Sequence, residues 1–175
     1  EGITLHPLYF QQDAQDIAHQ YTIPGVPPYV RSNKTRGYLK DSWRIAQEIT
    51  AGMPEDYNVA LQHDMQRGQS GVMLILDQAT RAGYDPDHAE AGQVGIDGLS
   101  LASFADFKAA LKGVDLRETP IYIEAATIPL PLTAFLVAMA NEEGVSLSDL
   151  RGCIASDPLG ELVRYGVLPT PLETA

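Results

Sequence analysis

A group of polar side chains follows the apolar run of residues 72–76. Its members could bind ligands or transfer protons: Asp77, Thr80, Arg81, Tyr84, Asp85, Asp87 and His88. Ionisable residues in a loop after a buried strand are typical of sites at the carboxyl edge of α/β sheets. His88, beside Asp85 and Asp87, could ligate a metal ion, but neighbours on one loop are weak evidence for ligand geometry. We therefore favour the interpretation that these residues form an ion-pair network that fastens the loop, rather than a catalytic or metal site.

The elements that must position these residues alternate between strands and helices. Residues 72–76, bounded by Gly71 and Asp77, form a continuous apolar run that predicts a strand buried on both faces. Further strands are predicted over 120–125 and 152–155, and helical spacing covers 57–65, 104–111, 130–143 and a segment from Pro158 to near Gly166. This βαβ order predicts an α/β fold of parallel strands whose carboxyl ends, at Asp77, Ala126 and Ser156, share one edge.

The first part of the chain lacks such periodicity. Residues 1–42 are rich in turn-forming residues, with Pro24, Pro27 and Pro28 close together, and predict an extended N-terminal arm. Residues 43–49 alternate in a way that could form a short strand. We therefore expect two regions, an arm over 1–42 and an α/β region over 43–175.

Composition excludes several classes of partner. The 175 residues carry a formal net charge of −11, which argues against nucleic acid and an anionic membrane surface as partners. No apolar run approaches the roughly 18 to 20 residues of a membrane span. The single cysteine, Cys153, excludes an internal disulfide and favours a cytoplasmic protein. An anionic ligand would need a local cluster of basic residues, and the nearest to one is Arg31, Lys34, Arg36 and Lys40.

The polar segment also carries a recognisable pattern. Residues 77–87, DQATRAGYDPD, followed by GQVG at 92–95, resemble the D-x-x-T-x-x-G-Y-D-x-D…G-D-V-G segment of the methylmalonyl-CoA mutase family. The resemblance continues through Leu130-Pro131, Ala134, Glu142 to Val145, Leu150 and residues 152–157, and upstream through residues 6–9, 24–29, Trp43 and Gln47. It therefore spans nearly the whole chain in order.

This resemblance implies a fold and a chemistry. The family's fold is a TIM (β/α)8 barrel with acyl-CoA along its axis, and such barrels need about 250 residues. Residues 43–175 would then be the N-terminal part of the barrel domain, with three or four of its βα units. The family rearranges the carbon skeleton of acyl-CoA with a radical supplied by adenosylcobalamin. None of the four histidines lies in the family's D-x-H-x-x-G cobalamin motif, so we expect no cofactor bound by this chain.

Several positions depart from the active members of the family. Those members resemble R-P-W-T-I-R-Q-Y-A-G-F, where the arginines hold CoA phosphates and the tyrosine packs over the substrate. Aligned on Trp43, this chain has Asp41 and Ala46 in place of the arginines and Glu48 in place of the tyrosine. The family's T-I-Q becomes Cys153-Ile154-Ala155, and its catalytic arginine aligns with Tyr165, one residue out of register from Arg164. These departures resemble the family's small, non-catalytic subunit.

Three functions remain open at this stage. The first is a structural, small-subunit-like portion of an adenosylcobalamin-dependent mutase with no catalytic residue. It would act with a catalytic large subunit or the remainder of the barrel, and we expect an oligomer. The second is the substrate-binding segment of a divergent active mutase, in which candidate contacts to acyl-CoA are Gln47, Asp77, Arg81 and Tyr84. The third is a stand-alone module that binds CoA or another small anion.

Overall fold

The computed structural model describes residues 2–39, 42–166 and 168. The chain divides into two compact units, Glu1–Trp43 and Arg44–Ala175, and each is described by itself. Within the described residues, no helix is long and apolar enough to cross a membrane.

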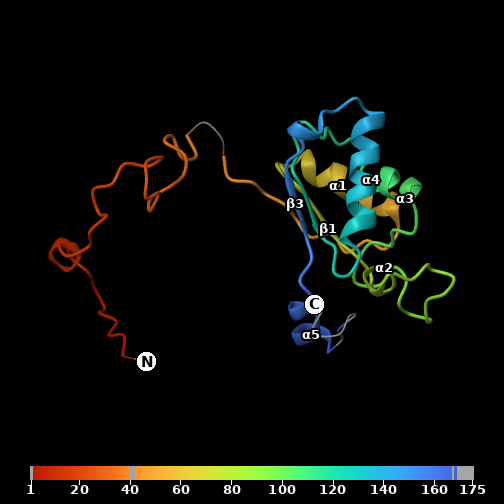
Figure 1. Ribbon diagram of the computed structural model, residues 1–175, viewed down its shortest axis with the longest axis horizontal. Coiled ribbons are helices and arrows are strands. Elements are labelled where there is room, and N and C mark those ends of the chain that lie inside the picture. The colour runs from red at the N-terminus through yellow and green to blue at the C-terminus, as the bar shows by residue number, and fades with distance from the viewer. Residues whose placement is uncertain (1, 40–41, 167, 169–175) are drawn as a thin grey trace. The chain divides into compact units, whose positions relative to one another are not determined.

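The described residues of the first unit form no core of their own. The regular element among them is the 3₁₀ helix η1 (Gln11–Ala14), where the Phe10 N–H donates to Asp13 Oδ2 at 2.7 Å. None of residues 2–39 is buried, and large apolar side chains such as Ile3, Leu5 and Tyr21 are exposed. Figure 1 shows the red and orange part of the ribbon as largely irregular chain. The apolar side chains of this unit therefore gain little stabilisation from packing within it.

The second unit is built on a parallel three-stranded sheet with the order β1-β2-β3. Its strands are β1 (Val72–Ile75), β2 (Ile121–Glu124) and β3 (Gly152–Ala155). Val72 pairs with Ile121, and Ile121 pairs with Gly152. The predicted parallel arrangement of sequential neighbours is confirmed, and the carboxyl ends of the strands share one edge.

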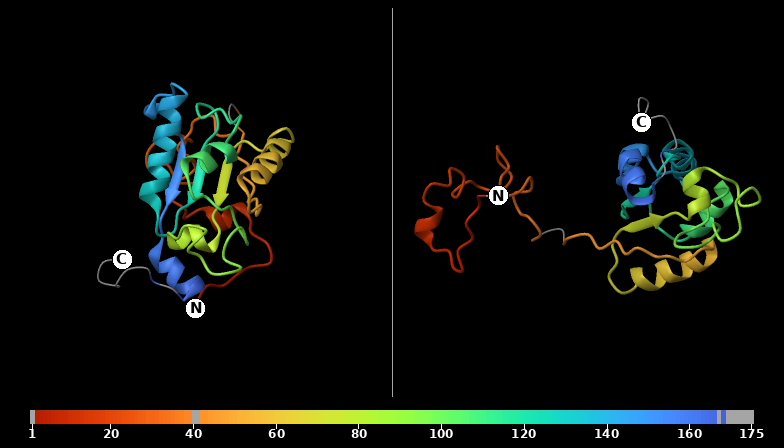
Figure 2. Two further views of the ribbon diagram at one scale, coloured as in Figure 1. Left: turned by 90° about the vertical axis from the view of Figure 1, so that its right-hand side faces the viewer. Right: turned by 90° about the horizontal axis from the view of Figure 1, so that it is seen from below.

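Helices cover one face of this sheet. The helices of the unit are α1 (Pro54–Met65), α2 (Gln78–Ala82), α3 (Phe104–Ala110), α4 (Pro129–Glu142), the 3₁₀ helix η2 (Leu147–Asp149) and α5 (Pro158–Tyr165). Figures 1 and 2 show α1, α3 and α4 on the same side of the strands. The core lies between them, where strand residues such as Leu74 and Ile123 meet helix residues such as Leu61, Phe107 and Leu132. Burying such side chains stabilises the unit by about 1.5 to 3 kcal/mol each.

The other face of the sheet is only partly covered, which corrects the prediction that the first strand is buried on both faces. Burial alternates along β1 and β2: Val72 and Leu74 are buried, while Met73 and Ile75 are half-buried. In β3 only Ile154 is half-buried, and its other residues are exposed. Successive side chains of a strand point to opposite faces, and among the described residues no helical layer covers the second face.

The predicted strand at 43–49 is also wrong. Only Glu48 bridges to β1, in a parallel pairing with Met73. The Ile45 carbonyl accepts from the Ser70 and Gly71 N–H groups at 2.9 and 3.0 Å, and the Ile45 N–H donates to Ser70 Oγ at 3.0 Å. These bonds tie the segment to the turn before β1, but no regular ladder with β1 forms.

Candidate functional site

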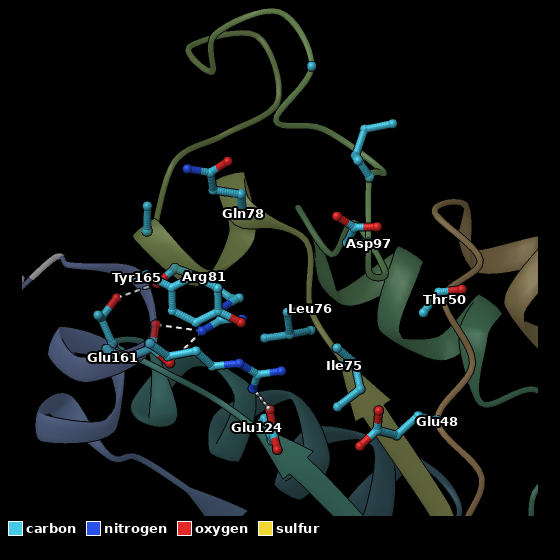
Figure 3. Close-up of a pocket in the computed structure, with 15 residues that line it drawn as sticks. Glu48, Thr50, Ile75, Leu76, Gln78, Arg81, Asp97, Glu124, Glu161 and Tyr165 are labelled. Atoms are coloured by element: carbon cyan, nitrogen blue, oxygen red, sulfur yellow. Dashed lines mark hydrogen bonds and ion pairs between the residues drawn. The ribbon is translucent and has the colours of Figure 1, made fainter.

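The carboxyl edge of the sheet opens onto a cavity of about 570 Å³. Side chains from five parts of the second unit converge on it (Figure 3). These are the segment before α1, the end of β1 with α2, the loop after α2, the end of β2, and α5. The lining residues that matter below are Glu48, Arg81, Asp97, Glu124, Glu161, Arg164 and Tyr165.

Asp77 fixes the loop at the edge of this cavity. It is the N-cap of α2, a short helix where only a loop was predicted, and its Oδ1 accepts from the Thr80 N–H at 2.8 Å. Its Oδ2 accepts from the Gly95 N–H at 2.6 Å. Gly83, with a left-handed φ of 77°, ends the helix. Asp77 is fully buried with both oxygens engaged, so its role in this structure is to cap α2 and tether the following loop.

Arg81 is the predicted site residue that lies in the cavity. Its Nη2 donates to both carboxylate oxygens of Glu161, and its Nη1 donates to Tyr165 Oη at 2.6 Å. Its guanidinium carbon lies 4.1 Å from the centroid of the Tyr165 ring, a cation–π contact. Burial, the largest influence, lowers the pKa of Arg81, but the hydrogen bonds to Glu161 and Tyr165 and the charge of Glu161 outweigh it and raise the pKa overall. Arg81 therefore stays charged and joins α2 to α5.

Carboxylates outnumber guanidinium groups around the cavity. Glu161 is paired with Arg81, and Glu124 lies 3.9 Å from Arg164. Glu48 and Asp97 line the cavity as well, and among its lining residues no further lysine, arginine or histidine faces them. A surplus of negative charge repels anionic groups, so the cavity does not favour a phosphate or a free carboxylate.

The other candidates lie apart from Arg81. Gln47 is on the opposite side of its segment from Glu48 and lines a smaller hollow with Arg67 and Gln69. Tyr84 is 57% exposed and does not line the main cavity. The basic residues Arg31, Lys34 and Arg36 belong to the first unit, whereas Lys40 and Asp41 lie outside the described residues.

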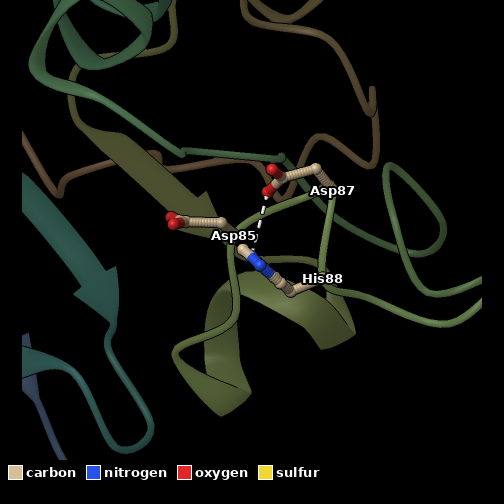
Figure 4. A group of neighbouring side chains, drawn as sticks. All are labelled: Asp85, Asp87 and His88. Atoms are coloured by element: carbon tan, nitrogen blue, oxygen red, sulfur yellow. Dashed lines mark ion pairs between the residues drawn. The ribbon is translucent and has the colours of Figure 1, made fainter.

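Asp85, Asp87 and His88 form the cluster that was considered for metal binding. One potential ligand atom from each lies within 4.8 Å of the others, and all three residues are exposed. Figure 4 shows them on the loop after α2, where His88 Nδ1 lies 3.2 Å from Asp87 Oδ1. Exposed neighbours on one loop can form such pairs without an ion, so the cluster carries no assignment.

A comparison with known protein families covers the whole chain. The family model described as methylmalonyl-CoA mutase matches residues 1–175. The chain belongs to the methylmalonyl-CoA mutase family. This confirms the family resemblance of residues 77–95 and of the matching residues before and after them.

Curated relatives agree with this assignment. The chain is 32% identical over 162 residues to methylmalonyl-CoA mutase of Escherichia coli, covering 92% of this chain and 23% of that protein. It is 30% identical over 164 residues to the methylmalonyl-CoA mutase large subunit of Porphyromonas gingivalis, covering 93% and 23%. It is 33% identical over 168 residues to the probable large subunit of Mycobacterium bovis, covering 93% and 22%. The chain thus spans about a quarter of the length of these relatives.

The residues that carry the methylmalonyl-CoA mutase pattern have structural roles here. Within D-x-x-T-x-x-G, Asp77 caps α2, Thr80 Oγ1 accepts from the Leu101 N–H at 3.1 Å, and Gly83 ends the helix. Sequence reasoning missed Glu161, the partner of Arg81. The one available signal was the predicted helix start at Asp157 and Pro158, which puts Glu161 in the first turn after β3, near the edge where Arg81 lies.

Proposed function

We propose that this chain is a small-subunit-like portion of an adenosylcobalamin-dependent methylmalonyl-CoA mutase and is itself structural rather than catalytic. The observation that carries the proposal is the acidic lining of the cavity. Glu48 occupies the position that resembles the tyrosine of active members, and with Asp97 it leaves surplus negative charge where an anionic acyl-CoA would have to enter.

The same proposal assigns residues 43–175 to the N-terminal part of a (β/α)8 barrel and residues 1–42 to an extended arm. Supporting it, three sequential βα units lie side by side, and among the described residues helices cover one face of the sheet. A barrel has this organisation, with helices outside and strand side chains filling the interior. The half-buried side chains of Met73, Ile75 and Tyr122 would then face the barrel interior.

The residues of this chain do not fit a cobalamin site. His6, His19, His63 and His88 are all exposed, and none of them lines the cavity. A histidine that ligates a metal in a cofactor is normally held by a second hydrogen bond within a packed site. We therefore assign adenosylcobalamin, and the radical chemistry it supplies, to another part of the complete enzyme.

A second candidate is the substrate-binding segment of a divergent active mutase. The relatives named mutase and large subunit favour it, as does the position of the cavity at the carboxyl edge of a parallel sheet, where barrel enzymes bind substrate. In that case Arg81 is the predicted contact residue best placed to meet acyl-CoA, because it lines the cavity whereas Gln47 and Tyr84 do not. Its partner Glu161 would have to move first.

Calorimetric titration of the full chain with desulfo-CoA separates the two candidates. The structural proposal predicts no saturable binding at micromolar ligand in the wild type. The variant Glu48→Gln, which removes one surplus carboxylate, tests whether charge is the obstacle, and Asp85→Asn on the exposed loop is the matched control for a lost charge. Saturable micromolar binding to the wild type would overturn the structural proposal and support the substrate-binding segment.

A further inference from the structure

Helix α5 contacts the rest of the second unit through charged side chains rather than apolar ones. Its apolar side chains face outward: Leu159 is 55% exposed and Val163 is 88% exposed, and no residue of the helix is buried. The side chain it turns inward is the charged Glu161, which is only 21% exposed and pairs with Arg81 at 14%. Burial of apolar surface, the usual means of docking a helix, therefore contributes little here.

The two ends of this contact differ in how firmly they are anchored. Arg81 lies on α2, whose N-terminus is capped by the buried Asp77, and its carbonyl accepts from Thr127 Oγ1 at 2.6 Å. On the other side, α5 is joined to β3 through Ser156, whose hydroxyl donates to the Ala126 carbonyl at 2.6 Å. Beyond Ser156, α5 contacts the rest of the described unit through the hydrogen bonds, ion pairs and cation–π contact of Glu161, Arg164 and Tyr165. Helix α2 is thus the more firmly anchored of the two partners.

We propose that α5 is a releasable latch over the cavity and that the Arg81–Glu161 ion pair keeps it closed. Three residues of α5 (Glu161, Arg164 and Tyr165) form one wall of the cavity. Turning α5 about the segment at Ser156 and Asp157 removes that wall and uncovers the guanidinium of Arg81. The latch goes beyond either proposed function, since it depends only on contacts within the second unit.

An ion pair suits such a latch better than apolar packing would. A charge-assisted hydrogen bond between an arginine and a carboxylate, here from Arg81 Nη2 to both oxygens of Glu161, is strong while both partners are charged, and it is lost when either partner is neutralised. Because a small part of the pair is exposed, added salt weakens it, though less than it would weaken a fully exposed pair. The second pair, Arg164 with Glu124, is longer at 3.9 Å and more exposed, so it contributes little to closure.

Hydrogen exchange measured by mass spectrometry on the full chain tests the latch. In Glu161→Gln we expect the amides of α5 to exchange roughly tenfold faster than in the wild type, while the amides of β1 and β2 keep their protection. The matched control is Glu142→Gln, which removes the 3.0 Å ion pair with Lys108 on the helical side of the sheet and should leave exchange in α5 unchanged. Reversing the charges, with Arg81→Glu and Glu161→Arg together, should restore slow exchange.

A second measurement keeps the test decisive if Glu161→Gln fails to fold. In the wild type, raising the salt concentration to about 0.5 M should speed exchange in α5 and leave β1 and β2 unchanged. The latch is refuted if α5 exchanges at the unprotected rate in the wild type at low salt, or if neither the substitution nor salt changes its exchange. It is also refuted if Glu142→Gln has the same effect on α5 as Glu161→Gln.

Discussion

Tyr57 illustrates how a single side chain combines packing with a polar requirement. It is the largest fully buried residue of the described core, and its hydroxyl donates to the Met73 carbonyl of β1 at 2.8 Å. This bond ties α1 to the first strand of the sheet. Burial raises the pKa of Tyr57, because the phenolate would lose its hydration in the core.

The raised pKa of Tyr57 predicts how stability changes in alkali. The unfolded chain releases this proton near pH 10 while the folded chain retains it, so the stabilisation is complete below about pH 10 and is lost as the pH rises. We expect the free energy of unfolding of the wild type to fall faster than that of Tyr57→Phe above pH 10, by up to about 1.4 kcal/mol per pH unit. Urea unfolding from pH 9 to 11 measures this. Tyr84→Phe, at an exposed position, is the control, and parallel profiles for wild type and Tyr57→Phe would contradict the prediction.

At the scale of elements, α2 is short and depends on its cap. Five residues cannot form a stable helix alone, since nucleation costs more than so few hydrogen bonds return. Asp77 offsets that cost because its carboxylate accepts a hydrogen bond from the Thr80 N–H and, across the loop, another from the Gly95 N–H. The same short helix carries Arg81, so the cap also positions the residue that holds α5.

Asp77→Asn should therefore destabilise the second unit. An asparagine keeps one oxygen, but its NH₂ group would face one of the two N–H donors and leave it unpaired in a buried place. The expected loss is about 1 to 3 kcal/mol in the free energy of unfolding, measured by urea denaturation. Asp85→Asn on the exposed part of the loop is the matched control and should stay within about 0.5 kcal/mol of the wild type. Equal stabilities of Asp77→Asn and the wild type would show that the two hydrogen bonds contribute nothing.

At the scale of the whole chain, the partly covered face of the sheet and the unpaired edge of β3 bear most on association. Within the described residues β3 pairs with β2 alone, and its second edge has no strand partner. Cys153 on β3 is exposed and lies in register with the half-buried Tyr122 and Met73. Exposed edges of this kind tend to pair with another strand.

We expect the isolated chain to associate through this edge or through residues 1–42. Sedimentation velocity at micromolar concentration should show a dimer or larger species. Cys153→Lys places a charge on the open face and should weaken association through the edge, whereas Val59→Lys, at an exposed position on α1, should not. A compact wild-type monomer whose β1 amides are protected from exchange would contradict the prediction and, with it, the proposal of a partial barrel.

The sequence by itself determined the order of the elements and many of their ends, because those signals are local. Apolar runs predicted the three strands, and their alternation with helices predicted that sequential strands lie side by side and parallel. Asp157 with Pro158 starts α5, close to the predicted start of that helix, and Ser103 caps α3 through a reciprocal bond with Asp106. The pattern of residues 77–87 also indicated the family before any geometry was known.

The tertiary structure alone decided which side chains meet. Arg81 and Glu161 are 80 residues apart, and only the adjacency of α2 and α5 at one sheet edge brings them together. Gln47 and Glu48 are neighbours in sequence, yet they line different hollows because the extended chain points successive side chains to opposite sides. An apolar run likewise does not reveal whether one or both faces of its strand are covered, since that depends on layers contributed by distant or separate segments.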